Sequence, residues 1–203
     1  MRNLNNPMMK VAYVAGVTTF CTFLGCWAVL AHQENAQPAQ STHSTVNDTQ
    51  FAKKAAQGGM AEVKMGQLAQ EKGTSDAVKK FGQRMVDDHS KAGDDLKKAA
   101  AQENMTLPND ISAKDKVTYD ALSKLSGAAF DRAYARDMVK DHEEDIADFN
   151  KEANGGQKAA IKDFASQTLP TLQDHLKQAK EMRQNVSASK SVKGGSAGNS
   201  GTK

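Results

Sequence analysis

The chain has 203 residues, 27 of them basic and 24 acidic, and aromatic residues make up only 5% of the composition. Both cysteines lie close to the N-terminus, which excludes a disulfide framework for the remainder of the chain. The charges are interspersed and no aromatic stacking platform accompanies the lysines, so we do not expect nucleic acid as a partner.

The first 31 residues have the layout of a secretory signal peptide. Residues 11–31 carry no charge, two basic residues precede them, and a polar linker follows at 32–47. We expect cleavage after Ala31 or Ala39. The apolar run is long for a signal peptide and could instead persist as a membrane anchor, because about 20 apolar residues span a bilayer. Under both interpretations the protein is extracytoplasmic, most simply periplasmic, and contacts a membrane only through residues 11–31.

Apolar residues recur at steps of three and four through most of residues 48–185, the pattern of amphipathic helices that pack on one another. Leu107-Pro108-Asn109-Asp110 breaks this pattern in the middle, and residues 186–203 read as a flexible tail. The predicted long helices are 48–72, 75–103, 127–153 and 157–185, with a shorter helical piece at 112–125.

The lengths of the connections predict how these helices are arranged. The first two long helices are joined by a tight turn, and so are the last two, so each pair should form an αα-hairpin. A single long crossover connection, which contains the short helix, joins the hairpins. This order predicts an all-α, ferritin-like antiparallel four-helix bundle over residues 48–185.

Each of the three histidines in this domain follows an aspartate, in the pairs Asp88-His89, Asp141-His142 and Asp174-His175. Each imidazole lies three or four residues from apolar residues on both sides, so all three should face the interior. Glu62 lies seven residues after Ala55 on the first helix and can also point inward. Glu62, His89 and His142 each lie near the middle of their helix, and His175 lies somewhat later. We therefore expect one polar layer across the bundle.

Three neutral imidazoles and a carboxylate are suitable ligands for one Zn, Fe or Cu ion. The predicted metal ligands are therefore Glu62, His89, His142 and His175. The neighbouring aspartates, Asp88, Asp141 and Asp174, would either hold the ring N–H groups as a second layer or face solvent.

Two other interpretations of this layer stay open. The same residues could form a hydrogen-bonded network that fixes the register of the helices without any ligand. Alternatively, the helices could be rotated so that the Asp-His pairs lie half exposed at the rim. The spacing of these residues alone does not establish how many of them bind a metal ion.

Four segments carry a family resemblance: 51–69, 81–92, 130–142 and 168–176. In this order they resemble the exported bacterial proteins labelled domain of unknown function 4142, within the ferritin-like superfamily. The resemblance implies an extracytoplasmic ferritin-like bundle and supplies no function. Some members of that family are labelled outer-membrane proteins.

Ferritin-like di-iron enzymes use a Glu-x-x-His pair on each of two helices. The residues three before the histidines are here Val86, Val139 and Leu172, so we do not carry ferroxidase or oxygenase roles over to this chain.

No other catalytic constellation is visible in the sequence. Residues 48–185 contain no cysteine, no glycine-rich phosphate loop and no nucleophilic serine motif, so we do not expect an enzyme. The leading hypothesis is an exported binding or stress-protective bundle that holds one metal ion. The alternatives are a structural or partner-binding bundle with a polar core layer, and a metal-dependent redox enzyme that acts through the same residues.

Overall fold

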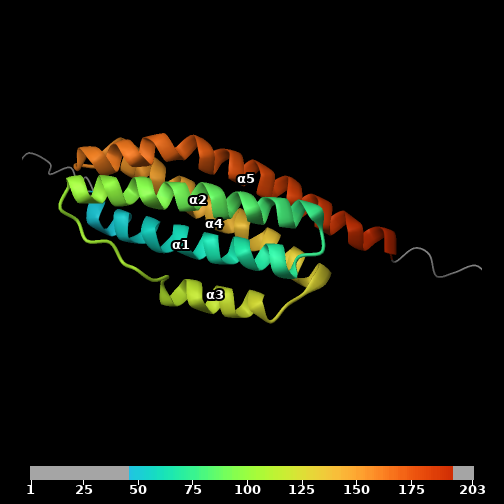
Figure 1. The fold of residues 1–203 in the computed structure, drawn as a ribbon. Helices are drawn as coiled ribbons and strands as arrows, with labels where there is room; N and C mark the ends of the chain where they lie inside the picture. Colours follow the sequence, from blue (N-terminus) through green and yellow to red (C-terminus); the bar gives the residue numbers. More distant parts are fainter. Residues whose placement is uncertain (1–45, 194–203) are drawn as a thin grey trace, which may run out of the picture. The chain divides into compact units, whose positions relative to one another are not determined.

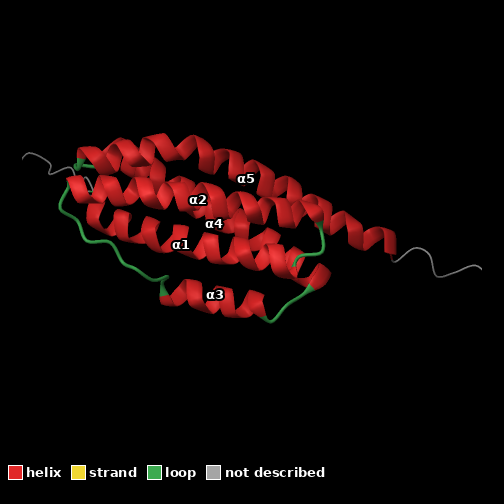
Figure 2. Ribbon diagram, in the orientation of Figure 1, coloured by secondary structure: helices red, strands yellow, loops and turns green. Residues whose placement is uncertain are grey.

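The structure is a computed structural model and describes residues 46–193. No strand occurs within this range, and the predicted all-α class is confirmed (Figure 2). The helices are α1 (Asp48–Lys72), α2 (Asp76–Gln102), α3 (Ala113–Ser123), α4 (Gly127–Gly155) and α5 (Ala159–Lys193).

The four long helices pack side by side as two hairpins (Figure 1). α1 packs on α2 and on α4, whereas α5 packs on α4 and on α2. The crossover between α2 and α4 contains α3, which lies against α1 and α4. Because this connection returns along the length of the helices, α4 runs in the same direction as α2 (Figure 1).

Carboxylates reach across from one hairpin to the turn of the other. Asp131 of α4 accepts hydrogen bonds from the backbone N–H groups of Thr74 and Ser75, both at 3.0 Å, and from the Thr74 hydroxyl at 2.8 Å. Asp48 of α1 accepts from the backbone N–H groups of residues 157–158, which join α4 to α5. Each hairpin turn is therefore fixed by an aspartate of the opposite hairpin, and this holds the two hairpins in register.

Within the first hairpin, α1 and α2 approach closely where two glycines face each other. A Cβ atom on Gly66 would lie 2.5 Å from the carbonyl oxygen of Gly82, and one on Gly82 would lie 2.7 Å from the carbonyl oxygen of Gly66. Only hydrogen fits at these two positions, so they set the spacing of α1 and α2.

The interior consists of two apolar clusters with polar residues between them. Met85, Met138 and Ala179 belong to one cluster, and Leu96, Phe149 and Leu172 belong to the other. On α2, α4 and α5 the buried histidine lies between members of the two clusters. The apolar side chains above and below thus close off this level of the bundle along the helix axes.

α5 runs further than the sequence analysis predicted. The predicted end was residue 185 and the helix continues to Lys193. Val186 is buried in the same cluster as Met182, four residues earlier, so the apolar stripe extends by one more turn. This explains why the first part of the predicted tail is helical.

The predicted signal peptide or anchor, residues 1–31, lies outside the described residues, as do most of the linker and residues 194–203. Within residues 46–193, no helix combines the length and the apolar character needed to cross a bilayer.

Candidate metal centre

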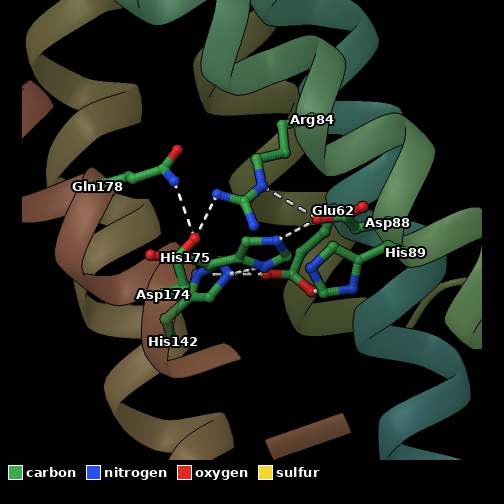
Figure 3. Close-up of polar contacts among 8 residues, drawn as sticks. All are labelled: Glu62, Arg84, Asp88, His89, His142, Asp174, His175 and Gln178. Atoms are coloured by element: carbon green, nitrogen blue, oxygen red, sulfur yellow. Dashed lines mark hydrogen bonds and ion pairs between the residues drawn. The ribbon is translucent and has the colours of Figure 1, made fainter. Parts of the chain in front are cut away.

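The structure brings the four predicted ligand residues together, one from each long helix (Figure 3). Glu62 comes from α1, His89 from α2, His142 from α4 and His175 from α5. All four are buried, and the most exposed of them, His89, retains 7% of its surface. The histidines are therefore not at the rim, which was one of the open interpretations.

The three imidazoles have the spacing of ligands to one ion. Their ring centroids are 5.2–5.8 Å apart, and one ring nitrogen of each lies within 4.8 Å of one from each of the others. His142 Nε2 and His175 Nδ1 are 3.3 Å apart. Two nitrogens bound to one tetrahedral zinc at about 2.0–2.1 Å would be about 3.3–3.4 Å apart. This pair already has that separation.

The outer ring nitrogens of this pair contact groups that can only accept hydrogen bonds. His142 Nδ1 lies 2.9 Å from the carbonyl oxygen of Met138, and His175 Nε2 lies 2.7 Å from Oδ2 of Asp88. Both outer nitrogens must therefore carry hydrogen. In metal sites the outer N–H of a ligating histidine is held in this way by a carbonyl or a carboxylate.

The inner nitrogens of His142 and His175 consequently face each other as lone pairs. Burial and the neighbouring His175 lower the pKa of His142 to about 4, and burial also lowers the pKa of His175. Both rings are therefore neutral near pH 7, with their single hydrogens on the outer nitrogens. Two acceptors 3.3 Å apart do not attract each other. A cation between them would satisfy both.

Glu62 and His89 complete the layer without forming a closed hydrogen-bond network. Glu62 Oε2 lies 3.0 Å from His89 Nδ1 and Oε1 lies 3.4 Å from His142 Nδ1, but neither contact has the alignment of a hydrogen bond. Among the described residues, both oxygens of Glu62 and Nε2 of His89 have no hydrogen-bond partner. Each such buried atom costs about 1–3 kcal/mol. This observation counts against a layer whose only role is structural.

The electrostatic environment favours the neutral forms of Glu62 and of the imidazoles when no cation is bound. Burial raises the pKa of the Glu62 carboxyl well above its usual value, and the carboxylates of Asp145 and Asp141 raise it further. Burial, together with the other two imidazoles, lowers the pKa of His89 well below its usual value. A bound cation would reverse the first effect, because it favours the ionised carboxylate.

Of the three neighbouring aspartates, only Asp88 holds an imidazole. It bonds to His175 on α5 rather than to the adjacent His89. Asp174 instead accepts hydrogen bonds from Arg84 at 2.6 Å and from Gln178 at 3.0 Å (Figure 3). Asp174 thus follows the second of the two predicted alternatives, because it is exposed and pairs with the guanidinium of Arg84 rather than with a ring N–H group.

Asp141 is partly exposed and forms no hydrogen bond to an imidazole among the described residues. Asp141 instead belongs to a group of three carboxyls, in which one oxygen from each residue lies within 4.8 Å of one oxygen from each of the others; the residues are Glu62, Asp141 and Asp145. Burial raises the pKa of Asp141 to about 6 and that of Asp145 to about 8. Asp145 and Arg84 were not among the predicted site residues. Spacing gives a weak signal for both, since Asp145 is three residues after His142 and Arg84 four before Asp88.

A pocket of about 520 Å³ reaches the layer from one side. Residues 107–110 of the crossover line it, and so do Glu62, His89 and Asp145. A metal site needs an entry path as well as ligands. This pocket supplies one.

The fold is similar to that of two solved structures. One is a DUF305 fragment from Deinococcus radiodurans, with a TM-score of 0.60 and 12% identity over 68% of this chain and 95% of that one. The other is a DUF305 protein from Streptomyces coelicolor, with a TM-score of 0.59 and 10% identity over 69% of this chain and 92% of that one. At such identities the similarity concerns the fold alone. No curated protein sequence matches the chain.

A family model matches residues 33–182, which cover the first four helices and most of α5. The family is described as a domain of unknown function, DUF4142, and the segments that carried the resemblance lie inside the matched range. The chain therefore belongs to the DUF4142 family.

Proposed function

We propose that this protein is an exported metal-handling bundle that holds one transition-metal ion between His89, His142 and His175. The observation that carries the proposal is the pair of facing lone pairs on His142 Nε2 and His175 Nδ1, 3.3 Å apart in a buried layer. Imidazole nitrogens suit Zn, Cu and Fe, and Glu62 beside His89 offers a negative charge that offsets the charge of the ion.

The orientation of the rings supports binding rather than a role in packing alone. Two of the three imidazoles are fixed through their outer nitrogens, by the Met138 carbonyl and the Asp88 carboxylate. Such contacts fix the tautomer as well as the ring plane, and they raise the basicity of the inner nitrogen. The third imidazole, His89, has an unpartnered Nε2 that remains available as a ligand.

Handling of a metal fits this site better than catalysis does. No cysteine lies among the described residues of the layer or of the pocket beside it, and the one serine there, Ser90, is exposed. With three imidazoles and a neighbouring carboxylate, the site can hold an ion firmly in a region from which bulk water is excluded.

Metal content tests the proposal directly. Untagged full-length protein would be stripped with a chelator, equilibrated with Zn²⁺, Cu²⁺ or Fe²⁺ in turn, and analysed for bound metal per chain. We expect about one equivalent for the wild type and none for His142→Ala. The His32→Ala/His43→Ala double variant removes the two remaining histidines of the chain and should retain the metal.

Thermal melting extends the same test and detects a misfolded variant. A ligand at 100 times its Kd stabilises the folded state by about 2.7 kcal/mol. The wild type should therefore melt higher with metal, whereas a folded His142→Ala or His175→Gln variant should not. Absence of bound metal from the wild type, with an unchanged melting temperature, would show that the layer is structural.

Export is part of the proposal and is tested separately. It is supported by the charge-free segment 11–31 between basic and polar flanks. Cell fractionation followed by mass spectrometry of the N-terminus should find the protein outside the cytoplasm and beginning near residue 32 or 40. A protein found in the cytoplasm would exclude export, and an extracytoplasmic chain beginning at Met1 would indicate an uncleaved anchor.

A further inference from the structure

Glu62 faces a second group of polar residues besides the imidazoles. Asp141 and Asp145 lie one turn apart on α4, and one oxygen of each lies within 4.8 Å of the other and of an oxygen of Glu62. Glu62 is fully buried, and neither of its oxygens has a hydrogen-bond partner among the described residues. The group therefore contains an unsatisfied buried carboxyl and not merely three acids on a surface.

The described residues supply no cationic partner for this group. Neither Asp141 nor Asp145 forms a hydrogen bond or an ion pair within residues 46–193. The two lysines whose charge reaches Asp141 are engaged elsewhere, since Lys54 pairs with Asp148 and Lys114 pairs with Glu144 at 3.1 Å. Three carboxylates at this spacing repel one another when they are ionised. A bound cation would turn that repulsion into attraction.

The spacing and the chemistry of the oxygens indicate which cation fits. Oxygens on opposite sides of one Ca²⁺, each about 2.3–2.6 Å away, are about 4.6–5.2 Å apart. Three oxygens spaced evenly around such an ion are at most about 4.0–4.5 Å apart, and the three oxygens here lie within 4.8 Å of one another, so at most a small movement of the side chains lets them share one ion of that size. A set made only of carboxylates favours hard ions such as Mn²⁺, Mg²⁺ and Ca²⁺ over the ions that imidazoles prefer. Asp141 and Asp145 are only partly buried, so water can complete the coordination.

We propose that Glu62, Asp141 and Asp145 bind a second divalent cation, a hard ion of the size of Mn²⁺ or Ca²⁺, beside the imidazole site. Glu62 lies between the two sites and its carboxylate separates the two positive charges. The two sites differ in chemistry, because one is rich in nitrogen and the other contains only oxygen. This inference goes beyond the proposed transition-metal site and does not require that site to be occupied.

Mn²⁺ is the probe for the second site, because free Mn²⁺ is counted by electron paramagnetic resonance. Chelator-stripped full-length protein would first be titrated with Zn²⁺ and then with Mn²⁺, and competition with Ca²⁺ would follow. We expect about one Mn²⁺ per chain in addition to one Zn²⁺. The Asp141→Asn/Asp145→Asn variant should bind Mn²⁺ at least tenfold more weakly and still bind one Zn²⁺.

Two controls make this comparison specific. Asp163→Asn removes an exposed carboxylate on α5, remote in sequence from the group, and should bind both ions as the wild type does. Circular dichroism reports whether the double variant is folded. It should melt at least as high as the wild type in chelator, because the substitutions relieve repulsion among buried carboxylates.

Each outcome is decisive. Zn²⁺ binding without Mn²⁺ binding would overturn the second site and leave the proposed function intact. Mn²⁺ binding that is unchanged in the double variant would show that Mn²⁺ binds elsewhere, and would also overturn it. Failure to bind either ion would overturn both proposals. Mn²⁺ binding without Zn²⁺ binding would support the second site alone.

Discussion

Asp88 contacts His175 and Asp174 does not, and this difference tests whether His175 is a metal ligand. Both accept a hydrogen bond from Arg84, Asp88 at 3.0 Å and Asp174 at 2.6 Å. Only Asp88 also contacts the outer nitrogen of His175, at 2.7 Å. Asp88→Asn therefore alters the group that orients the ring, whereas Asp174→Asn alters only exposed contacts, the ion pair with Arg84 and the hydrogen bond from Gln178.

The expected loss of metal affinity in Asp88→Asn follows from the hydrogen bond that an asparagine side chain can make to His175. Its amide can turn its NH₂ group toward Nε2, which favours the tautomer with hydrogen on Nδ1 and blocks the inner lone pair. Loss of such an orienting carboxylate costs about 10–100-fold in metal affinity, or about 1.4–2.7 kcal/mol. At a Zn²⁺ concentration of 100 times the wild-type Kd, the stabilisation by metal should fall from about 2.7 kcal/mol to about 0.4–1.4 kcal/mol.

Thermal melting with and without Zn²⁺ is the assay. For a domain of about 150 residues, 1 kcal/mol corresponds to about 3 °C. Zn²⁺ should raise the melting temperature by about 8 °C in the wild type and in Asp174→Asn, but by only about 1–4 °C in Asp88→Asn. Without metal, Asp88→Asn should melt lower than Asp174→Asn, because it also weakens the hydrogen bond to the buried His175, whereas the ion pairs with Arg84 are partly exposed and contribute less than about 1 kcal/mol.

Two results would refute the reasoning. An equal loss in both variants would show that Arg84, and not His175, transmits the effect. An unchanged response in Asp88→Asn would show that His175 does not bind the metal, or does not need its carboxylate to do so.

Other substitutions test the fold and the buried polar groups. Gly82→Ala should lower the free energy of unfolding by about 1–3 kcal/mol, because the added Cβ would lie 2.7 Å from the Gly66 carbonyl oxygen. Gly93→Ala on the same helix is the control, because its Cβ would enter open space, and it should raise the free energy of unfolding by about 0.5–1 kcal/mol. Urea unfolding measures both changes. Tyr134→Phe should raise stability by about 1 kcal/mol in the same assay, because its buried hydroxyl has no hydrogen-bond partner among the described residues, and a loss would reveal a partner. Burial and the nearby Asp48 raise the pKa of Glu152 from 4.5 to about 7 in the folded protein. Folding therefore favours the protonated carboxyl, and the free energy of unfolding should fall as the pH rises from about 4.5 through 7. Glu152→Gln should remove this pH dependence and melt higher than the wild type at pH 8.

The positions of the helices could be predicted from the sequence because the apolar stripe and the breaks between helices are local signals. The end of α5 was missed although Val186, four residues after Met182, continued the stripe. The glycine-rich and lysine-rich residues that follow favour a flexible tail and obscure this signal. The contacts of Asp131 and Asp48 could not be predicted, because each depends on which turn lies beside the carboxylate in the folded chain.

The inward direction of the three histidines could also be predicted, because it depends only on their spacing from apolar neighbours on the same helix. The partners of the adjacent aspartates could not, because a residue one step along a helix is rotated by about 100° and points toward the seam with a neighbouring helix. The group that such an aspartate contacts at the seam depends on how the neighbouring helix is rotated about its axis. Asp88 meets an imidazole, and Asp174 meets the guanidinium of Arg84.

One repeated dipeptide therefore produces unlike environments on the two sides of the bundle. At the seam between α2 and α5, the charge of Arg84 offsets the aspartates, and the interior beside them presents imidazole nitrogen. At the seam between α1 and α4, no cation among residues 46–193 pairs with Asp141, and the groups that lie beside it are the carboxylates of Glu62 and Asp145. The affinity of a cation for such a site depends on whether the ligands are nitrogen or oxygen. The imidazole side therefore favours Zn or Cu, and the carboxylate side favours Mn or Ca. Glu62 is the boundary between them, which is why its substitution by Gln should weaken binding at both sites, whereas substitution of His175 should affect only one.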